Sequence, residues 1–369
     1  MNKPTLRADH IGSILRPATL VAAREARTAG TLAPAALRVI EDACIREVVT
    51  RQEAAGLYAI SDGDYRRGAF HIDFLTQLAG IEYRARGFAK FQGGERSGYA
   101  PAVFETVGPI AHVRDIAVED FKYLQSVTRR VPKVTLPSPT FAHCRGGRDA
   151  IDRRAYPDLD QFFADLATAY RTEIAALARA GCRYVQLDEV HYTFFCDPKL
   201  SAGLRARGDD PAKLALTYAK LINDSIADCP ADMIIGIHLC RGNHRSNWVA
   251  EGGYEPVAEV LFNEIKADRF LLEYDSSRAG GFAPLRFLPK GKIAVLGLVT
   301  TKTSEIESVD LLRRRIDEAA RYTTLDQLAI SPQCGFASSI PGNLITPAAQ
   351  WAKLELCAKV ASDVWGGAG

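Results

Sequence analysis

Short apolar segments alternate with longer amphipathic segments along this chain, and this alternation constrains its fold more than any other feature. Eight segments have the length and apolar content of β-strands, at residues 6–12, 57–63, 133–137, 184–188, 233–238, 270–275, 293–299 and 328–331. Between most of them, apolar residues recur at the spacing of a helix face, over residues 35–55, 159–179, 212–226 and 309–322. Near-continuous apolar strands are typical of parallel sheets that helices cover on both faces. We therefore expect residues 1–369 to form one domain of the α/β class, a (β/α)₈ TIM barrel.

Two segments interrupt the alternation. Residues 80–109 include Gly93-Gly94 and Tyr99, and we expect them to form a hairpin that leaves the barrel. Residues 145–158 are polar, and we expect a loop that acts as a flap near the barrel mouth. The sequence therefore predicts a barrel with a hairpin excursion and mouth loops.

Charge and composition argue against several classes of function. The formal net charge is +2, and we find no basic tract that would favour nucleic acid or a membrane surface. The apolar runs are far shorter than the ~20 residues of a membrane helix, and the first ten residues lack the apolar core of a signal sequence. Eight cysteines are dispersed along the chain, which is typical of free thiols or ligands in a reducing compartment. We therefore expect a cytoplasmic protein that acts on small molecules.

Side chains suited to catalysis or metal binding lie at the C-terminal ends of the predicted strands. In a barrel of this kind, those ends carry the active site. The residues are His10, Asp62, Asp64, Asp188, Glu189, His238, Cys240, Glu273 and Cys334.

The run from Ile234 to Cys240 places His238 and Cys240 two residues apart at a strand end. Residues i and i+2 of a strand point to the same face, so this imidazole and thiol can bind one ion. Glu273 and Cys334, at two later strand ends, supply a carboxylate and a second thiol. One nitrogen, one oxygen and two sulfur ligands suit tetrahedral Zn²⁺, which is therefore the predicted cofactor.

Five motifs at successive strand ends resemble those of one enzyme family. They are Ile11-Gly12-Ser13, Asp62-Gly63-Asp64, Gln186-Leu187-Asp188-Glu189, His238-Leu239-Cys240 followed by Glu273, and Pro332-Gln333-Cys334-Gly335. In this order they resemble the C-terminal catalytic barrel of cobalamin-independent methionine synthase, over nearly the whole chain. The resemblance implies a zinc-dependent methyltransferase of methionine biosynthesis that methylates a thiol, with homocysteine as acceptor and methionine as product.

The resemblance also implies roles for individual residues. The positions that match the metal ligands are His238, Cys240, Glu273 and Cys334. The positions that match those around the amino-acid portion of homocysteine are Ile11, Gly12, Ser13, Asp64, Asp188 and Glu189. Carboxylates such as Asp64 and Asp188 are suited to binding an ammonium group by charge-assisted hydrogen bonds. A zinc centre with two thiolates and one carboxylate is net negative, which favours attack by a bound sulfur on carbon over hydrolysis.

The chain departs from that family where the methyl donor binds. Its length allows one barrel, whereas the family enzyme has two. Val299 aligns with a histidine that is thought to protonate the folate nitrogen, and residues 136–139 lack the tryptophan that stacks on folate. Because a general acid contributes ~10²–10⁴-fold to such reactions, we expect a donor other than polyglutamylated folate, such as the corrinoid methylcobalamin or a sulfonium compound. The candidates for a substitute acid are His191, His143, Lys302 and Tyr192.

Two alternative functions stay open at this point. The epoxyalkane:coenzyme M transferases are similar in the zinc site and in their single-barrel size, and Arg16, Arg241 or Arg245 would then bind a sulfonate. A non-catalytic zinc barrel that binds a thiol or a corrinoid partner is the other alternative, with residues 241–248 as its partner surface.

Structural roles are also open for some of the acidic residues. Asp64 can form an ion pair with Arg66 or Arg67, and Glu273 can do the same with Arg269 or Arg278.

Overall fold

Parallel strands form the centre of the computed structural model, which describes residues 3–84, 92 and 103–369. The largest sheet within these residues has six strands, each hydrogen-bonded to the next one in chain order. They are β5 (Val134–Pro137), β6 (Tyr184–Glu189), β7 (Ile234–Leu239), β8 (Arg269–Glu273), β9 (Ile293–Val299) and β10 (Leu328–Pro332). All neighbouring pairs are parallel, and nearly all strand residues are buried. Burial on both faces explains the near-continuous apolar pattern of these strands.

Two further strand segments lie between β10 and β5. Ala8 forms a parallel bridge with Ile330 of β10. The strand β1 (Ala59–Ile60) pairs in parallel with β4 (Val131–Pro132), which leads directly into β5. The eight predicted strand segments therefore follow one another around a ring, and the predicted (β/α)₈ barrel is confirmed.

Side-chain hydrogen bonds take the place of a strand ladder between the first two segments of the ring. The Ser61 hydroxyl donates to the carbonyl oxygen of Gly12 at 2.5 Å, and Nε2 of His10 lies 3.0 Å from the carbonyl oxygen of Ala59. The strands predicted at residues 6–12 and 57–63 are consequently shorter than expected, with a single bridge in the first and two residues in the second.

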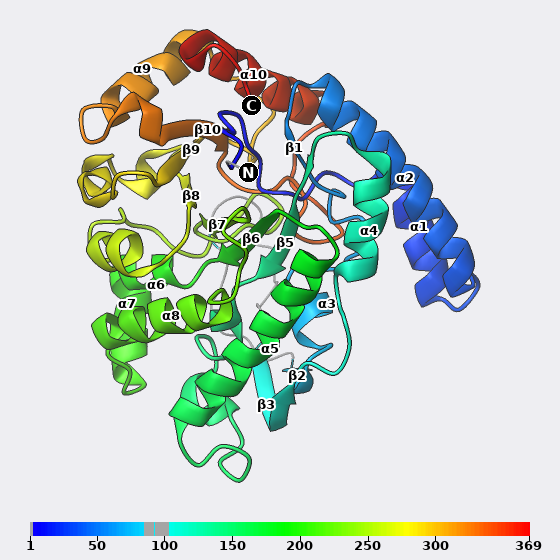
Figure 1. The fold of residues 1–369 in the computed structure, drawn as a ribbon, viewed down its shortest axis with the longest axis vertical. Coiled ribbons are helices and arrows are strands. Elements are labelled where there is room, and N and C mark those ends of the chain that lie inside the picture. The colour runs from blue at the N-terminus through cyan, green and yellow to red at the C-terminus, as the bar shows by residue number, and fades with distance from the viewer. Residues whose placement is uncertain (1–2, 85–91, 93–102) are drawn as a thin grey trace.

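Helices surround the strands (Figure 1). Four of them match the predicted helical segments: α2 (Pro34–Ala54), α5 (Leu159–Arg179), α8 (Pro211–Ser225) and α9 (Val309–Ala319). Six others were not predicted: α1 (Ala18–Thr28), α3 (Ile72–Leu75), α4 (Val118–Val127), α6 (Tyr192–Cys196), α7 (Pro198–Ala206) and α10 (Pro347–Trp365).

Side-chain caps determine where several of these helices begin. Asp158 accepts from the Gln161 amide at 3.1 Å and starts α5, and Asp210 caps α8, whose first residue is a proline. Ser308 and Thr346 cap α9 and α10 in the same way. Such residues satisfy amide groups that have no partner inside the helix, so each boundary is encoded locally.

The predicted hairpin is present as β2 (Ala79–Arg84) paired antiparallel with β3 (Val103–Ala111). It lies beside α5, in the lower part of Figure 1. Gly93, Gly94 and Tyr99 lie outside the described residues.

The segment at 145–158 that we expected to form a flap is anchored to this hairpin. Ile151 forms a bridge with Thr106 of β3, and the Asp152 amide donates to the carbonyl oxygen of Thr106 at 2.8 Å. A short 3₁₀ helix at Gly147–Ala150 precedes this contact.

A buried ionic network ties the first segment of the barrel to β6 and β8. Nζ of Lys133 lies 2.9 Å from Oδ1 of Asp9, and the hydroxyl of Tyr184 donates to Oδ2 of Asp9 at 2.7 Å. Nε of Arg269 lies 3.5 Å from the same oxygen. Positive charge from Lys133 and Arg269 outweighs burial and lowers the pKa of Asp9 to about 2.

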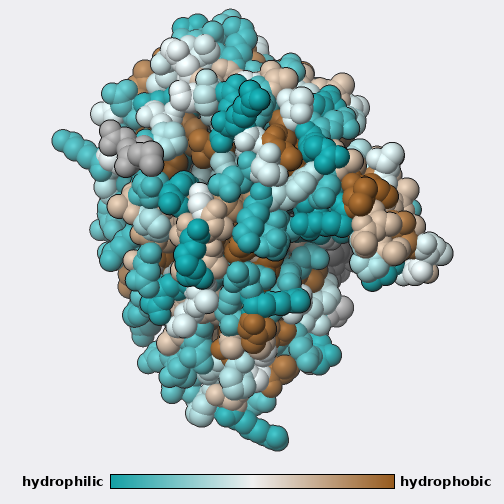
Figure 2. All heavy atoms as spheres, turned by 45° about the vertical axis from the view of Figure 1, so that its right-hand side comes forward, coloured by the Kyte–Doolittle hydropathy of each residue, from teal (hydrophilic) through white to brown (hydrophobic). Residues whose placement is uncertain are grey.

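The two ends of the described chain meet beside β10. The amides of Arg7 and Ala8 both donate to the carbonyl oxygen of Ala368, so the last residues close against the first segment. The face seen in Figure 2 carries mainly hydrophilic side chains, with small hydrophobic groups among them. Within the described residues, no helix combines the length and the apolar character that crossing a membrane requires.

Candidate active site

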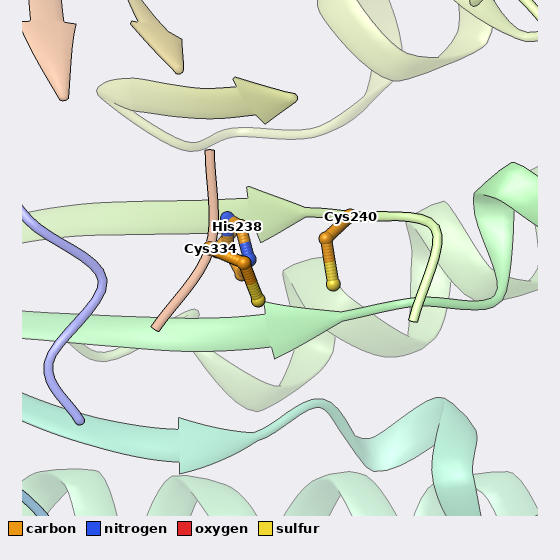
Figure 3. Close-up of side chains that lie close together, drawn as sticks. All are labelled: His238, Cys240 and Cys334. Atoms are coloured by element: carbon orange, nitrogen blue, oxygen red, sulfur yellow. The ribbon is translucent and has the colours of Figure 1, made fainter. Parts of the chain in front are cut away.

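Three side chains converge beside the C-terminal end of β7. His238 lies in β7, Cys240 directly follows it, and Cys334 reaches the same point from the segment after β10 (Figure 3). One ligand atom from each of the three residues lies within 4.8 Å of the other two, and all three residues are buried. The structure thus brings together three of the four predicted metal ligands.

The imidazole of His238 is held in the orientation that a metal ligand needs. Nδ1 lies 3.1 Å from the carbonyl oxygen of Leu271 in β8. Because a carbonyl oxygen only accepts, the hydrogen of a neutral ring is on Nδ1. Nε2 is buried and has no hydrogen-bond partner among the described residues. Metal-ligating histidines usually hold their second nitrogen in this way. A lone pair on Nε2 beside two thiols fits a thiophilic ion such as Zn²⁺.

Glu273, the fourth predicted ligand, is not a member of this close group. It ends β8 and is fully buried, but one carboxylate oxygen accepts from the Arg241 amide at 2.8 Å. The other oxygen lies 3.1 Å from Nη2 of Arg278. Positive charge from Arg241, Lys302 and Arg278 outweighs burial and lowers the pKa of Glu273, so the carboxylate is ionised. The ion pair with Arg278 is the structural role that the sequence left open.

A cavity opens above the metal-binding group. Its empty volume, which includes the opening to solvent, is about 820 Å³. The described residues that line it are Ile11, Ser13, Asp64, Ala69, Phe70, His71, Arg145, Asp188, Val190, Phe194, His238, Cys240, Gly242, Asn243, His244, Val249, Cys334, Gly335, Ser338 and Ser339. Most of its exposed wall is apolar, with a few polar groups between.

Two carboxylates line this cavity next to the metal-binding group. Burial, together with the charge of Asp64, raises the pKa of Asp188 to about 6 although His238 opposes the shift. Nε2 of Gln186 donates to Oδ1 of Asp188 at 2.6 Å and fixes its orientation. Asp64 lies 3.4 Å from Arg67, the ion pair that the sequence allowed, and burial raises its pKa. These carboxylates bring negative charge to a largely apolar wall.

The first segment of the barrel contributes Ile11 and Ser13 to the same cavity. Gly12 has a φ of +126°, and a Cβ there would lie 2.7 Å from the side chain of Thr135. A Cβ on Gly335 would lie 2.0 Å from Oγ of Ser13. Both glycines therefore permit a backbone approach that a larger residue would prevent, and this approach places Ser13 beside the segment that carries Cys334.

The remaining predicted residues lie outside the lining of the cavity. Oε2 of Glu189 accepts from Thr140 at 2.5 Å and Oε1 from the His191 amide at 2.5 Å, so its carboxylate belongs to a buried network. Nδ1 of His191 lies 2.9 Å from the Thr140 hydroxyl. Among the candidate acids, burial lowers the pKa of His191 well below its ordinary value.

The other candidate acids are also held by neighbouring groups. Nδ1 of His143 lies 2.8 Å from the Tyr218 hydroxyl, and burial lowers the pKa of His143 to about 4. Nζ of Lys302 contacts Asn243 and the carbonyl oxygen of Asn247, each at 3.4 Å.

Several lining residues were not predicted as substrate-site residues from the sequence, although two of them lie in segments that it marked as a mouth flap and a partner surface. Phe70 and His71 follow the second strand segment, Arg145 follows β5, Phe194 lies in α6, and His244 follows Cys240. Each lies in a long connection after a barrel strand, which is where this fold places substrate contacts. This position is the only signal in the sequence, because loop conformation decides which of these side chains turn inward.

Comparisons with known proteins identify similar chains. Residues 6–348 match the family model described as cobalamin-independent synthase, catalytic domain. The protein YxjH of Bacillus subtilis (strain 168) is 41% identical over 367 residues, which cover 98% of this chain and 96% of that protein. The methionine synthase of Pyrococcus furiosus is 25% identical over 340 residues, covering 91% and 87% of the two chains. A crystal structure from Listeria monocytogenes, 36% identical, covers 99% of both chains with a TM-score of 0.79.

Proposed function

Because the chain belongs to the family of cobalamin-independent methionine synthase catalytic domains, we propose that it is a zinc-dependent methyltransferase whose acceptor is the thiol of homocysteine and whose product is methionine. The observation that carries the proposal is the convergence of His238 Nε2, Cys240 and Cys334 on the floor of a cavity that Asp188 also lines.

The ligand atoms of His238, Cys240 and Cys334 indicate what a bound ion would do. When bound, Zn²⁺ lowers the pKa of a substrate thiol, so that the sulfur is available as a thiolate at neutral pH. The sulfur lone pair then forms the bond to the methyl carbon while the bond between that carbon and the donor breaks, and the donor leaves with the electron pair.

The residues of the chain position the acceptor for this step. Asp188, oriented by Gln186, and Asp64 offer carboxylate oxygens to the ammonium group of an amino-acid thiol. Ser13 offers a hydroxyl beside Cys334, and Ile11 and the other apolar lining residues exclude water from the reacting sulfur.

We propose Glu273 as the fourth ligand. Its carboxylate can bind the ion only after its ion pair with Arg278 breaks. The carboxylate is ionised and buried, which a zinc ligand requires, but its Oε1 atom is engaged by the Arg278 guanidinium. Binding of the ion therefore competes with this ion pair.

The environment of the donor supports a molecule other than polyglutamylated folate. Val299, at the position of the family histidine, is fully buried in β9 and has no proton to give. His191, His143 and Lys302 are not among the lining residues of the cavity, and each side chain contacts another polar group. A donor that leaves without protonation suits this arrangement better than a folate nitrogen.

The two alternatives have less support. The Arg16 guanidinium donates to four backbone carbonyl oxygens. The Arg241 guanidinium donates to the carbonyl oxygen of Gly252 and to the Tyr254 hydroxyl, so both cations are occupied in holding loops together. The carboxylates Asp64 and Asp188 line the cavity beside the metal-binding group, and their negative charge favours the ammonium group of an amino-acid thiol over the sulfonate of coenzyme M. A purely binding role would not require metal ligands that can activate a thiol.

Elemental analysis of the protein, followed by X-ray absorption spectroscopy at the zinc edge with and without homocysteine, tests the proposal. We expect about one zinc per chain and one additional sulfur neighbour when homocysteine is added. A protein that binds zinc but shows no change with homocysteine would contradict the choice of acceptor. A protein without zinc would contradict the site itself.

A further inference from the structure

The two thiols of the metal-binding group follow strands that are not neighbours. Cys240 follows β7 and Cys334 follows β10, and in the six-stranded sheet β8 and β9 lie between these two strands. The strand ladder therefore does not join the two thiol-bearing segments directly. Two sulfur atoms on one tetrahedral Zn²⁺ ion lie ~3.8 Å apart, because each Zn–S bond is ~2.3 Å long. Such a separation requires that the two segments be held together across the mouth of the barrel.

A side chain of one segment bonds directly to the other. Nδ2 of Asn243, three residues after Cys240, donates to the carbonyl oxygen of Gly335 at 2.8 Å. Gly335 directly follows Cys334, so this bond joins the two segments close to their ligands. The carbonyl oxygen of Asn243 adds a second bond, because it accepts from the Ser338 hydroxyl at 3.0 Å. Asn243 is thus bonded to the segment that carries Cys334 through both its side chain and its backbone.

A lysine determines the orientation of the Asn243 amide group. Lys302, in the connection after β9, is buried, and its Nζ lies 3.4 Å from Oδ1 of Asn243. The same ammonium group lies 3.4 Å from the carbonyl oxygen of Asn247. An ammonium group only donates, so its partner on the amide is the oxygen, and the amide nitrogen faces Gly335. Lys302 therefore favours the one orientation of the amide in which Asn243 can donate across the mouth.

The backbone around Asn243 is held in a single, unusual conformation. Arg245 and Ser246 have φ values of +49° and +67°, and the Asn247 amide donates to the carbonyl oxygen of His244 at 2.9 Å to close this turn. Residues other than glycine keep such φ values only where the surrounding structure imposes them. The Ser246 amide donates to Oδ1 of Asn343, in the segment after β10, at 3.2 Å. The turn after Cys240 is therefore fixed by contacts with the segment that carries Cys334.

Asn243 also lines the cavity, so direct contact with a ligand is the alternative to a role in holding these segments. Both polar atoms of its amide already have partners within the protein, Oδ1 in Lys302 and Nδ2 in Gly335. Metal sites need their ligands held within ~0.5 Å of the productive geometry by such supporting hydrogen bonds. The geometry therefore favours the supporting role.

We propose that Asn243 is a positioning residue of the metal site, which ties the turn after Cys240 to the turn after Cys334 and keeps the two thiols at the separation that one ion needs. The inference rests on the proposed function in that it takes zinc as the resident ion. Asn243 acts on the ligands through the backbone, so the ion should still bind without it, but more weakly and in a less regular geometry. Hydrogen-bonded neighbours of metal ligands typically contribute about 10- to 100-fold to metal affinity.

The variant Asn243→Ala tests this role with the metal ion alone. Zn²⁺ affinity is measured by competition between the zinc-loaded protein and a chromophoric chelator. The visible absorption of the Co²⁺-loaded protein reports the coordination geometry, because tetrahedral Co²⁺ absorbs more strongly than Co²⁺ of higher coordination number. We expect Zn²⁺ affinity to fall about 10- to 100-fold and the absorption at saturating Co²⁺ to weaken. A residue with a merely structural role would lower the free energy of unfolding and leave the Co²⁺ spectrum unchanged.

Asn223→Ala is the matched control. Nδ2 of Asn223 donates to the carbonyl oxygen of Glu264 at 2.8 Å, and its Oδ1 accepts from the Lys266 amide at 2.8 Å. Asn223 thus ties α8 to another segment with one bond donated and one accepted, and it does not line the cavity. Its loss should leave Zn²⁺ affinity and the Co²⁺ spectrum unchanged.

Two results would overturn the inference: natural Zn²⁺ affinity with a natural Co²⁺ spectrum in Asn243→Ala, or the same changes in Asn223→Ala as in Asn243→Ala. If Asn243→Ala does not fold, Asn243→Ser keeps a polar side chain that is too short to reach Gly335, and it should give the same weaker affinity and altered spectrum. These measurements use neither homocysteine nor a methyl donor, so a failure of the proposed acceptor does not affect them. A natural protein that binds neither ion would contradict both the proposed function and this inference.

Discussion

Nδ1 of His238 in β7 lies 3.1 Å from the carbonyl oxygen of Leu271 in β8, so the neighbouring strand determines which nitrogen of this imidazole faces the two thiols. The register of the sheet places His238 opposite Leu271. A backbone carbonyl in a parallel ladder cannot shift without disturbing both strands, so the ring is preorganised before any ion arrives.

Removal of any one of the three converging ligands should abolish metal retention. We expect His238→Ala, Cys240→Ser and Cys334→Ser each to fall from about one zinc per chain to a small fraction, because three strong ligands are the minimum of ordinary zinc sites. Inductively coupled plasma mass spectrometry after dialysis measures the content. Cys229→Ser is the control, since Cys229 is a partly exposed thiol outside the cavity. Full zinc content in all three ligand variants would refute the site.

Asp188→Asn should weaken acceptor binding while leaving the metal in place. The substitution removes the negative charge but keeps an oxygen near Gln186, so the cavity should retain its shape. Loss of a charge-assisted hydrogen bond costs ~1.5–3 kcal/mol, which corresponds to about 10- to 150-fold in the dissociation constant of homocysteine. Isothermal titration calorimetry gives that constant, and the exposed Asp160→Asn serves as the control. Unchanged homocysteine affinity would indicate that the acceptor has no ammonium group at this position.

The sequence predicted the barrel well because its strands are buried on both faces. The strands β6 to β10 begin and end within two residues of the predicted segments, and α5 has the predicted bounds. Helix α10 was missed for a physical reason: its buried residues cover more than half of its circumference and include the polar Gln350 and Lys353, so no narrow apolar stripe marks it.

Strand-end positions were enough to predict the converging ligands but not the state of every side chain. His238 and Cys240 share a face because of strand geometry alone. The engagement of Glu273 by Arg278 depends on the turn after β8, and the inward position of Arg145 depends on a turn that Arg207 holds from another part of the chain. Contacts of this kind arise from loop conformation, which no periodicity encodes.

Gly335→Ala should disturb the segment that carries Cys334. The added Cβ would lie 2.0 Å from Oγ of Ser13, so one of the two segments must move. Overpacking of this kind typically costs 1–3 kcal/mol, and we expect a loss of about that size in the free energy of unfolding together with weaker zinc binding. Urea denaturation and competition with a zinc chelator measure the two effects. Gly281→Ala is the control, because a Cβ there would meet no other described group within 4 Å. Equal behaviour of the two variants would contradict the proposed close approach.

The buried imidazole of His10 should lower the free energy of unfolding in mild acid. Burial, and then the charge of Lys133, lowers the pKa of His10 to about 4, whereas an unfolded chain has a histidine pKa near ~6.5. Between these values the unfolded state binds a proton that the folded state does not, so stability present above pH ~6.5 is lost as the pH falls towards about 4. The loss is on the order of 3 kcal/mol. Urea midpoints at pH 7 and pH 4.5 should differ less in His10→Gln than in the natural protein. An identical pH dependence in both would show that His10 does not titrate as we expect.

Lys133→Met should be among the most destabilising single substitutions, because it leaves the buried carboxylate of Asp9 without its closest cation. Removing one partner of a buried ion pair costs about 3–5 kcal/mol, much more than the pair itself contributes. The double variant Asp9→Asn with Lys133→Met should therefore lose less stability than the sum of the two single variants, since the uncompensated charge is gone. Lys220→Met is the control: Lys220 is an exposed partner of Asp224 on α8, and its loss should change the free energy of unfolding by less than about 1 kcal/mol. Chemical denaturation of all four variants gives the coupling energy. Strict additivity of the two substitutions at the buried pair would show that Asp9 and Lys133 do not interact as the barrel geometry indicates.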